Sequence, residues 1–267
     1  MVTPSYNQGR FIEETIRSVL LQGYPNLEYI IIDGGSTDNS VEIIKRYENW
    51  LKHWVSEPDR GQSHAVNKGY EKASGEIYGW LNSDDYLLKD ALKNVAMAYN
   101  VHPDAGGWFG GCLQVNVDDK KLVVWWPKRL DAEGLAEWSK NTVGQPACFF
   151  SAKAWQTCGP LDETLHYGMD FDLWLNIAKV FPLQNVNDML AAAHVHRDAK
   201  TRRDIGQSLA YQYLIQIRHG YERFAIDDIN QQINNYLKLT RKLDRISRFP
   251  LLRPLMPIAR MVWKRLL

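Results

Sequence analysis

The residues in this sequence best suited to chemistry are two adjacent carboxylates that follow an apolar run. The run IYGWL occupies residues 77–81 and is followed by NSDD at 82–85. Adjacent carboxylates repel each other unless a cation neutralises them. Oxygen ligands of this kind suit Mg²⁺ or Mn²⁺ bridging a diphosphate. The pattern indicates a divalent-cation site, and a solvated Asp-Asp turn before a helix near Lys89 fits it equally well.

Two other polar segments have residue types that can bind a nucleotide. Asp33 ends an apolar run in IIDGGSTD at 31–38, where its carboxylate can accept a hydrogen bond from a base or a ribose. Arg60 lies in DRGQSHAVNKG at 59–69, a loop entering a helix, and the first amides of a helix favour anions. The alternatives are a simple βα turn at Asp33 and a surface arginine at Arg60.

The elements that position these residues alternate between strands and helices up to about residue 100. Ile12, Ile16 and Val19 fall on one helical face, and strands are expected at 27–32, 53–56 and 77–81. Helices are expected after Asp38 and over 62–73. This alternation predicts βαβ units in an α/β fold, where ligands bind outside the carboxyl ends of the strands.

The second half of the chain has a different pattern. Residues 106–117 and 121–126 are β-rich and are joined by a hairpin signal at 118–120, which predicts a mixed sheet. Helical periodicity returns at 170–180, and residues 198–245 read as two long polar helices.

Composition narrows the class of protein. The 267 residues suffice for one large α/β domain, and a net charge of +1 provides no broad field for nucleic acid, so no nucleic-acid partner is expected. The 3 cysteines lack the spacing of a zinc site or a disulfide framework, which favours a reducing, cytoplasmic setting. Neither a signal peptide nor an apolar run of membrane-spanning length is present. The glycine-rich loops of dinucleotide-binding and P-loop proteins are missing.

Four segments in order carry a resemblance to a known family. TPSYN at 3–7, DGGSTD at 33–38, the stretch 60–69 and NSDD at 82–85 resemble the family-two inverting glycosyltransferases with the GT-A fold. GPLDE at 159–163 and YGMDFDLWL at 167–175 resemble the family's acceptor-side segment. The resemblance implies one Rossmann-like mixed sheet flanked by helices. It places a catalytic domain at 1–200, with a nucleotide-binding half to about residue 100 and an acceptor half beyond it, followed by a helical extension at 201–267.

The family pattern implies a set of residues that contact the nucleotide sugar. Uridine is the commonest occupant of the base pocket, which would be lined by Pro4, Tyr6, Asp33 and Arg60. Asp84 would face the ribose or the donor sugar, and Asp85 would bind Mn²⁺ or Mg²⁺ directly. The full expected donor set is Thr3, Pro4, Tyr6, Asn7, Asp33, Arg60, Gln62, Asn67, Ser83 and Asp84.

The resemblance also implies a general base and a further metal ligand. Asp170 would take the proton from an acceptor hydroxyl, with Met169 in the place of the family's usual glutamate. Its alternative role is to cap the helix that follows. In LAAAHVH at 190–196, His196 would help to hold the metal or the diphosphate, with His194 as the alternative. Gln145 would lie near the acceptor.

Two departures from the family pattern matter. Only two residues precede Thr3, so the first strand is expected to be truncated or incomplete. A Gln-x-x-Arg-Trp motif, which marks processive polysaccharide synthases, is absent, and this favours transfer of one sugar to a glycan, lipid-linked or other hydroxyl acceptor. The alternatives are a sugar-phosphate nucleotidyltransferase, for which NQGR at 7–10 is a poor loop, and a non-catalytic nucleotide- or glycan-binding protein.

The C-terminal segment is basic and apolar. No acid follows Asp244, and three prolines, Pro250, Pro254 and Pro257, interrupt any long helix. Its basic and apolar residues indicate an interfacial segment attracted to anionic lipid, which would place the protein peripherally on the inner face of a membrane. Packing on the catalytic body or on a second subunit is the alternative.

Overall fold

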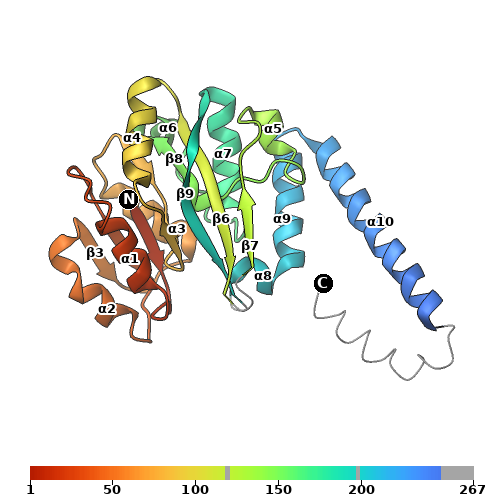
Figure 1. The fold of residues 1–267 in the computed structure, drawn as a ribbon, viewed down its shortest axis with the longest axis horizontal. Coiled ribbons are helices and arrows are strands. Elements are labelled where there is room, and N and C mark those ends of the chain that lie inside the picture. The colour runs from red at the N-terminus through yellow and green to blue at the C-terminus, as the bar shows by residue number, and fades with distance from the viewer. Residues whose placement is uncertain (118–120, 197–198, 248–267) are drawn as a thin grey trace.

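A short parallel sheet forms the first part of the fold (Figure 1). The computed structural model describes residues 1–117, 121–196 and 199–247. The sheet has the order β1-β2-β3, with all pairs parallel. Its strands are β1 (Val2–Ser5), β2 (Ile30–Asp33) and β3 (His53–Ser56). This arrangement confirms the predicted βαβ units.

Helices cover both faces of this sheet, which explains why β2 is apolar throughout. They are α1 (Ile12–Leu20), α2 (Ser40–Arg46) and α3 (Gln62–Glu71), with a 3₁₀ turn at Glu48–Trp50. Ile30 and Ile32 pack in one cluster with α3, whereas Ile31 packs in the other with α1 and α2. Successive strand residues thus contribute to two separate cores.

The strand β1 keeps its full pairing despite its shortness. Each of its residues has a partner in β2, from Val2 opposite Ile30 to Ser5 opposite Asp33. A parallel bridge joins Val2 to Trp80, and the Leu81 amide donates to the Val2 carbonyl at 3.0 Å. The first strand therefore links the small sheet to the rest of the molecule.

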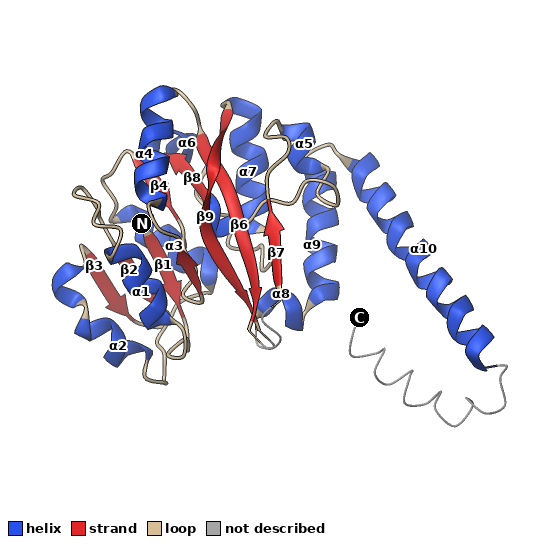
Figure 2. Cartoon of the chain, viewed as in Figure 1, coloured by secondary structure: helices blue, strands red, loops and turns tan. Residues whose placement is uncertain are grey.

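The second sheet is mixed, as the sequence predicts (Figure 2). Its central pair, β6 and β9, is parallel, and the other pairs are antiparallel, including the predicted hairpin of β6 and β7. The order is β4-β8-β6-β9-β5, with β7 on β6. The strands are β4 (Ile77–Gly79), β5 (Asp85–Leu87), β6 (Gly107–Asn116), β7 (Leu122–Trp125), β8 (Cys148–Ser151) and β9 (Leu183–Val195).

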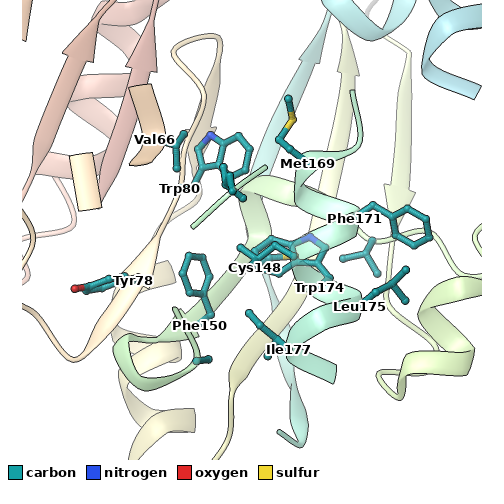
Figure 3. Packing of buried hydrophobic residues seen from close by; sticks show 14 of the residues in the cluster. Val66, Tyr78, Trp80, Cys148, Phe150, Met169, Phe171, Trp174, Leu175 and Ile177 are labelled. Carbon is teal, nitrogen blue, oxygen red and sulfur yellow. The ribbon is translucent and has the colours of Figure 1, made fainter. Parts of the chain in front are cut away.

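The helix α7 (Met169–Val180) is buried along most of its length, which fixes the position of its first turn (Figure 3). Trp174 lies between two aromatic rings, with centroid distances of 4.9 Å to Phe109 and 5.5 Å to Phe150. The remaining helices of this part are α4 (Ala91–Val101), α5 (Ala132–Ala136) and α6 (Ala152–Cys158), with a 3₁₀ turn at Gln145–Ala147.

The end of the described chain is helical but differs in detail from the prediction. The sequence predicts two long helices over 198–245, whereas the structure has a short α8 (Lys200–Arg203) before α9 (Ile205–Arg218) and α10 (Glu222–Ser247). Gly220, with φ of +83°, separates α9 from α10. None of the helices in the described ranges is long and apolar enough to span a bilayer. The basic tail predicted to contact lipid lies largely at 248–267, outside the described residues.

Candidate active site

A cavity of about 1180 Å³ lies where the two sheets meet. Its wall is formed by the ends of β1 and β2, the segment after β4, the start of α7, the end of β9 and the helices α8 and α9. Eight predicted site residues line it: Pro4, Tyr6, Asn7, Gln62, Ser83, Asp84, Asp85 and Asp170. The fold therefore brings together residues more than 160 positions apart.

The turn after β1 forms one wall of the cavity. Asn7 has φ of 52°, a left-handed conformation that asparagine tolerates better than most residues. Its Oδ1 accepts from the Thr37 amide at 2.8 Å, and its own amide donates to Ser36 Oγ at 2.7 Å. These bonds join the turns that follow β1 and β2, and leave the side chain of Tyr6 exposed at the cavity.

Thr3 and Asp33 lie behind the wall rather than in it. The Asp33 side chain is buried, and its carboxylate accepts bonds from the Ser36 amide and hydroxyl and from Ser56 Oγ. Thr3 is also buried, with its Oγ1 3.1 Å from the Tyr29 hydroxyl. The sequence predicts that both residues contact a nucleotide directly. Their positions do not support that contact, because both are buried and their polar atoms already have protein partners.

Arg60 and Asn67 also lie outside the cavity wall. The Arg60 guanidinium is exposed and pairs with Glu163 at 2.7 Å. Asn67 Nδ2 donates to the Leu161 carbonyl at 3.0 Å and to Glu163 at 3.2 Å, and its Oδ1 accepts from the Leu161 amide at 2.9 Å. Both residues therefore hold the loop that leads to α7, a role that the sequence prediction did not include.

The two adjacent acids have different surroundings. Asp85 is 5% exposed, and its two carboxylate oxygens accept from the His194 amide at 3.1 Å and from Asn82 Nδ2 at 3.3 Å. Burial raises the pKa of Asp85 well above its ordinary value, and the neighbouring Asp84 carboxylate raises it further. Asp85 is thus held by the protein on both oxygens.

Asp84 points into the cavity and meets the predicted histidine. Its Oδ2 lies 3.2 Å from His196 Nε2, and its side chain is 20% exposed. The His196 ring is buried against Phe11 at 4.7 Å, and its Nδ1 has no hydrogen-bond partner among the described residues. The structure therefore pairs His196 with Asp84 rather than with Asp85.

This acid-histidine pair is the part of the described chain that best fits a divalent cation. Within the described ranges no three His, Cys, Asp or Glu side chains are arranged to hold a metal by themselves. Mg²⁺ and similar ions are often bound by one or two protein ligands together with substrate phosphates and water. Asp84 lies in the wall of the large cavity, and the His196 imidazole lies directly behind it, so the pair meets that requirement.

Asp170 lies in the first turn of α7 and faces the same cavity. Burial raises the pKa of its carboxyl, which the Phe171 amide and the positive charge of Lys200 partly offset. Gly168 precedes the helix with φ of +71°, and a Cβ there would lie 2.7 Å from Ile215 Cδ1. A glycine is therefore required to start the helix at this point.

The wall around Asp170 is aromatic and basic. Its rings come from Trp125, Trp138, His166, Tyr167 and Phe171, and its cations from Lys200, Arg202 and Arg203. The Lys200 ammonium lies 4.8 Å from the Tyr167 ring centroid, and burial lowers its pKa. These cations were not predicted from the sequence, although the run KTRR at 200–203, shortly after His196, was a usable signal. Gln145 also lines the cavity.

Comparison with known proteins places this site in a family context. The family model described as Glycosyl transferase family 2 matches residues 1–154. A chondroitin synthase of Pasteurella multocida is 25% identical over 255 residues, which cover 90% of this chain and 25% of that protein. The chain thus spans about a quarter of the length of this relative.

Solved structures resemble the chain in fold. S. aureus TarS 1-349 in complex with UDP-GlcNAc has a TM-score of 0.63 and 18% identity, covering 81% of this chain and 64% of that one. The mannosyltransferase PcManGT of Pyrobaculum calidifontis, in complex with GDP-Man and Mn²⁺, has a TM-score of 0.64 and 18% identity, covering 96% and 82%. These likenesses confirm the predicted GT-A fold.

Proposed function

Because the chain belongs to glycosyl transferase family 2, we propose that it transfers one sugar from a nucleotide-diphosphate sugar to a hydroxyl acceptor, with inversion at the anomeric carbon. One observation carries the proposal, which is that Asp84 and Asp170 line a single cavity. A group that binds the leaving diphosphate and a base that activates the acceptor must both reach the same sugar carbon. We take residues 1–200 as the catalytic unit, with side chains at the start of the 201–267 extension completing the cavity wall.

We propose a UDP-sugar as the donor, bound along the turn after β1. Pro4, Tyr6 and Asn7 would line the base and ribose, and Gln62 and Ser83 would lie on either side of the sugar. The structural neighbour TarS was solved with UDP-GlcNAc, which supports a uridine nucleotide, whereas PcManGT was solved with GDP-Man. The cavity is large enough for either, because drug-sized ligands occupy about 300–1,000 Å³.

We propose that Asp84 and His196 hold a divalent cation, Mn²⁺ or Mg²⁺. The 3.2 Å separation of Asp84 Oδ2 and His196 Nε2 supports this pair. The Mn²⁺ in the PcManGT structure supports the use of a divalent cation. When bound, the cation offsets the negative charge of the departing diphosphate. In this proposal Asp85, which the sequence resemblance implied as the direct ligand, supports the site through its bonds from the His194 amide and Asn82 Nδ2.

Asp170 is the proposed general base. Its carboxylate would accept the proton of the acceptor hydroxyl as that oxygen attacks the anomeric carbon. A base works best when its pKa lies near the working pH, and burial moves the pKa of Asp170 in that direction. Met169 lies beside it where the family's usual glutamate would stand, so the acceptor contact of that glutamate is missing in this chain.

The acceptor is proposed to be a glycan or a lipid-linked glycan. Trp125, Trp138 and Tyr167 provide flat apolar surfaces in the wall near Asp170, and such surfaces suit sugar rings. No observation favours a nucleotidyltransferase. A non-catalytic binding protein is also disfavoured, because a site without turnover has no need of Asp170 in this position. We also propose that the basic C-terminal segment contacts an anionic membrane.

Donor turnover and nucleotide binding test the proposal separately. UDP-sugars are incubated with the protein, acceptor and Mn²⁺ while UDP release is measured, and UDP binding is followed by calorimetry. Asp170→Asn should lower the turnover rate by about 10²-fold or more, since a general base contributes about 10²–10⁴-fold in rate. The variant should still bind UDP. Asp84→Asn should weaken Mn²⁺-dependent UDP binding.

The matched control is Asp188→Asn, a carboxylate that is exposed on β9 away from the cavity wall. This variant should behave as the unaltered protein does in both assays. Full turnover in Asp170→Asn would disprove the role of the base, and metal-independent UDP binding would disprove the cation site.

A further inference from the structure

The helix α10 carries an apolar stripe that the rest of the described chain leaves exposed. The stripe residues follow each other at intervals of 3, 4 and 4, which places them on one face of an α-helix. Their exposed fractions are 55% for Ile226, 37% for Ile229, 50% for Ile233 and 42% for Leu237. Scattered apolar residues on a surface are ordinary, whereas a continuous stripe marks an interaction site.

The first turns of α10 are anchored to the body of the molecule. Ala225 is fully buried, and Asp228 accepts a hydrogen bond from the buried Gln216 at 3.2 Å. Every residue over 231–238 is exposed, and Figure 1 shows α10 leading away from the body. A helix without tertiary packing is only marginally stable in water. The exposed length of α10 therefore needs a partner for its stripe.

The charges of α10 identify the partner. Acids outnumber bases near its start, where Glu222, Asp227 and Asp228 accompany Arg223. Bases outnumber acids near its end, where Lys238, Arg241, Lys242 and Arg245 accompany Asp244. An antiparallel copy of the same helix places each acidic end beside a basic end, which is the self-complementarity that a twofold pair requires. A parallel copy would place Asp227 beside its own equivalent, and an anionic lipid surface would repel the acidic end.

The positions around the helix fit this pairing. At 3.6 residues per turn, Asp227, Lys238 and Arg241 fall on the same flank of the stripe. Equal flanks of two antiparallel helices face each other. With Ile233 at the twofold axis, Ile229 lies across from Leu237 of the second copy, and Asp227 lies close to Lys238 of that copy.

We propose that two copies of this chain form an antiparallel dimer through α10, with Ile233 against its own equivalent. The dimer then contains two active-site cavities, and catalysis in each cavity does not depend on dimer formation. This interface uses residues that have no part in the proposed catalytic site.

Disulfide capture tests the register. The full chain with Ile233→Cys is oxidised and separated on a non-reducing gel, with Gln231→Cys as the matched control, because residue 231 is exposed on the opposite face of the helix. The unaltered chain reports the background from Cys158, since Cys112 and Cys148 are buried. A covalent dimer in Ile233→Cys alone is expected. Equal capture at both positions, or none, would overturn the register and the proposal.

Sedimentation analysis tests whether the apolar stripe and the charges of α10 hold the dimer together. Ile233→Asp should weaken the dimer by about a hundredfold, because each copy loses a buried isoleucine, and Gln231→Asp should not. A first variant reverses the acidic end, with Glu222→Lys and Asp227→Lys together. A second reverses the basic end, with Lys238→Glu, Arg241→Glu and Lys242→Glu together. Each variant alone should be a monomer. A mixture of these two variants should associate again.

Other occupants of the stripe give different results. In one such result the unaltered protein is a monomer at all concentrations, and Ile233→Asp lowers its stability without changing its oligomeric state. This would show that the chain's own tail covers the stripe, and it would overturn the dimer. Binding of the monomer to phosphatidylglycerol vesicles that Ile233→Asp abolishes would show a lipid surface instead, with the same consequence. Circular dichroism and UDP binding verify that each variant is folded.

Discussion

Asn67 provides a sharp test of whether a family motif residue contacts the nucleotide or holds the protein together. Its side chain makes three hydrogen bonds to the loop at 161–163, two of them to the backbone of Leu161. Leu161 is 4% exposed, so its amide and carbonyl have little access to water when Asn67 is removed. At about 1 kcal/mol net for each bond, and more for unsatisfied buried groups, Asn67→Ala should cost about 2–4 kcal/mol.

The change is measurable by two independent routes. Urea unfolding followed by tryptophan fluorescence should show the loss of stability, and Tm should fall by about 4–16 °C, since 1 kcal/mol corresponds to about 2–4 °C in a domain of this size. UDP affinity should be unchanged, whereas kcat should fall by about tenfold or more, because the loop positions α7 and small displacements of a base are costly.

The control is Asn100→Ala, an exposed position on α4, which should leave stability, UDP affinity and kcat unchanged. Weakened UDP binding with an unchanged urea midpoint in Asn67→Ala would refute this reasoning and restore a direct nucleotide contact.

Three further predictions follow from single interactions. Lys200→Met removes a positive charge that lowers the pKa of Asp170, so the acidic limb of the kcat/KM profile should move to higher pH, which a pH-rate profile checks against Lys93→Met. Gly168→Ala places a Cβ at positive φ and should cost about 1–2 kcal/mol in urea unfolding, whereas Gly206→Ala, with open space around it, should not. Burial raises the pKa of Glu28, but its bonds from Lys52 and Ser74 prevail and lower it to about 2. Its contribution, about 1 kcal/mol after solvent screening, is therefore present above pH 4.5 and lost as pH falls toward 2, so the stability difference between Glu28→Gln and the unaltered protein should disappear in acid titrations.

The elements of the first half were predictable from the sequence because they rest on local patterns. The helix at Ile12, the strand at 53–56 and the helix from Gln62 all stand where periodicity and turn residues place them. The division of 198–245 was less predictable, since a helix as short as α8 has no periodicity of its own to detect.

The site was predictable as a set of segments but not as a set of contacts. In strands, successive side chains point to opposite faces, so the register of β5 against β9 decides which of two adjacent acids meets His196. That register, with Asp85 opposite Ala193, joins residues more than 100 positions apart and leaves no local trace in the sequence. Asp33 shows the same limit, because its bond to Ser56 comes from a neighbouring strand.

The position of the proposed base depends on both sides of the cavity. On the donor side, Asn67 of α3 holds the loop at 161–163, which leads into α7. On the other side, His219 Nε2, just after α9, lies 2.9 Å from Oδ1 of Asp172, which is two residues along α7 from Asp170. Asp170 stands between these two attachments. Loss of either one should therefore lower turnover more than nucleotide affinity, because the proposed nucleotide site lies along the turn after β1, which neither attachment contacts.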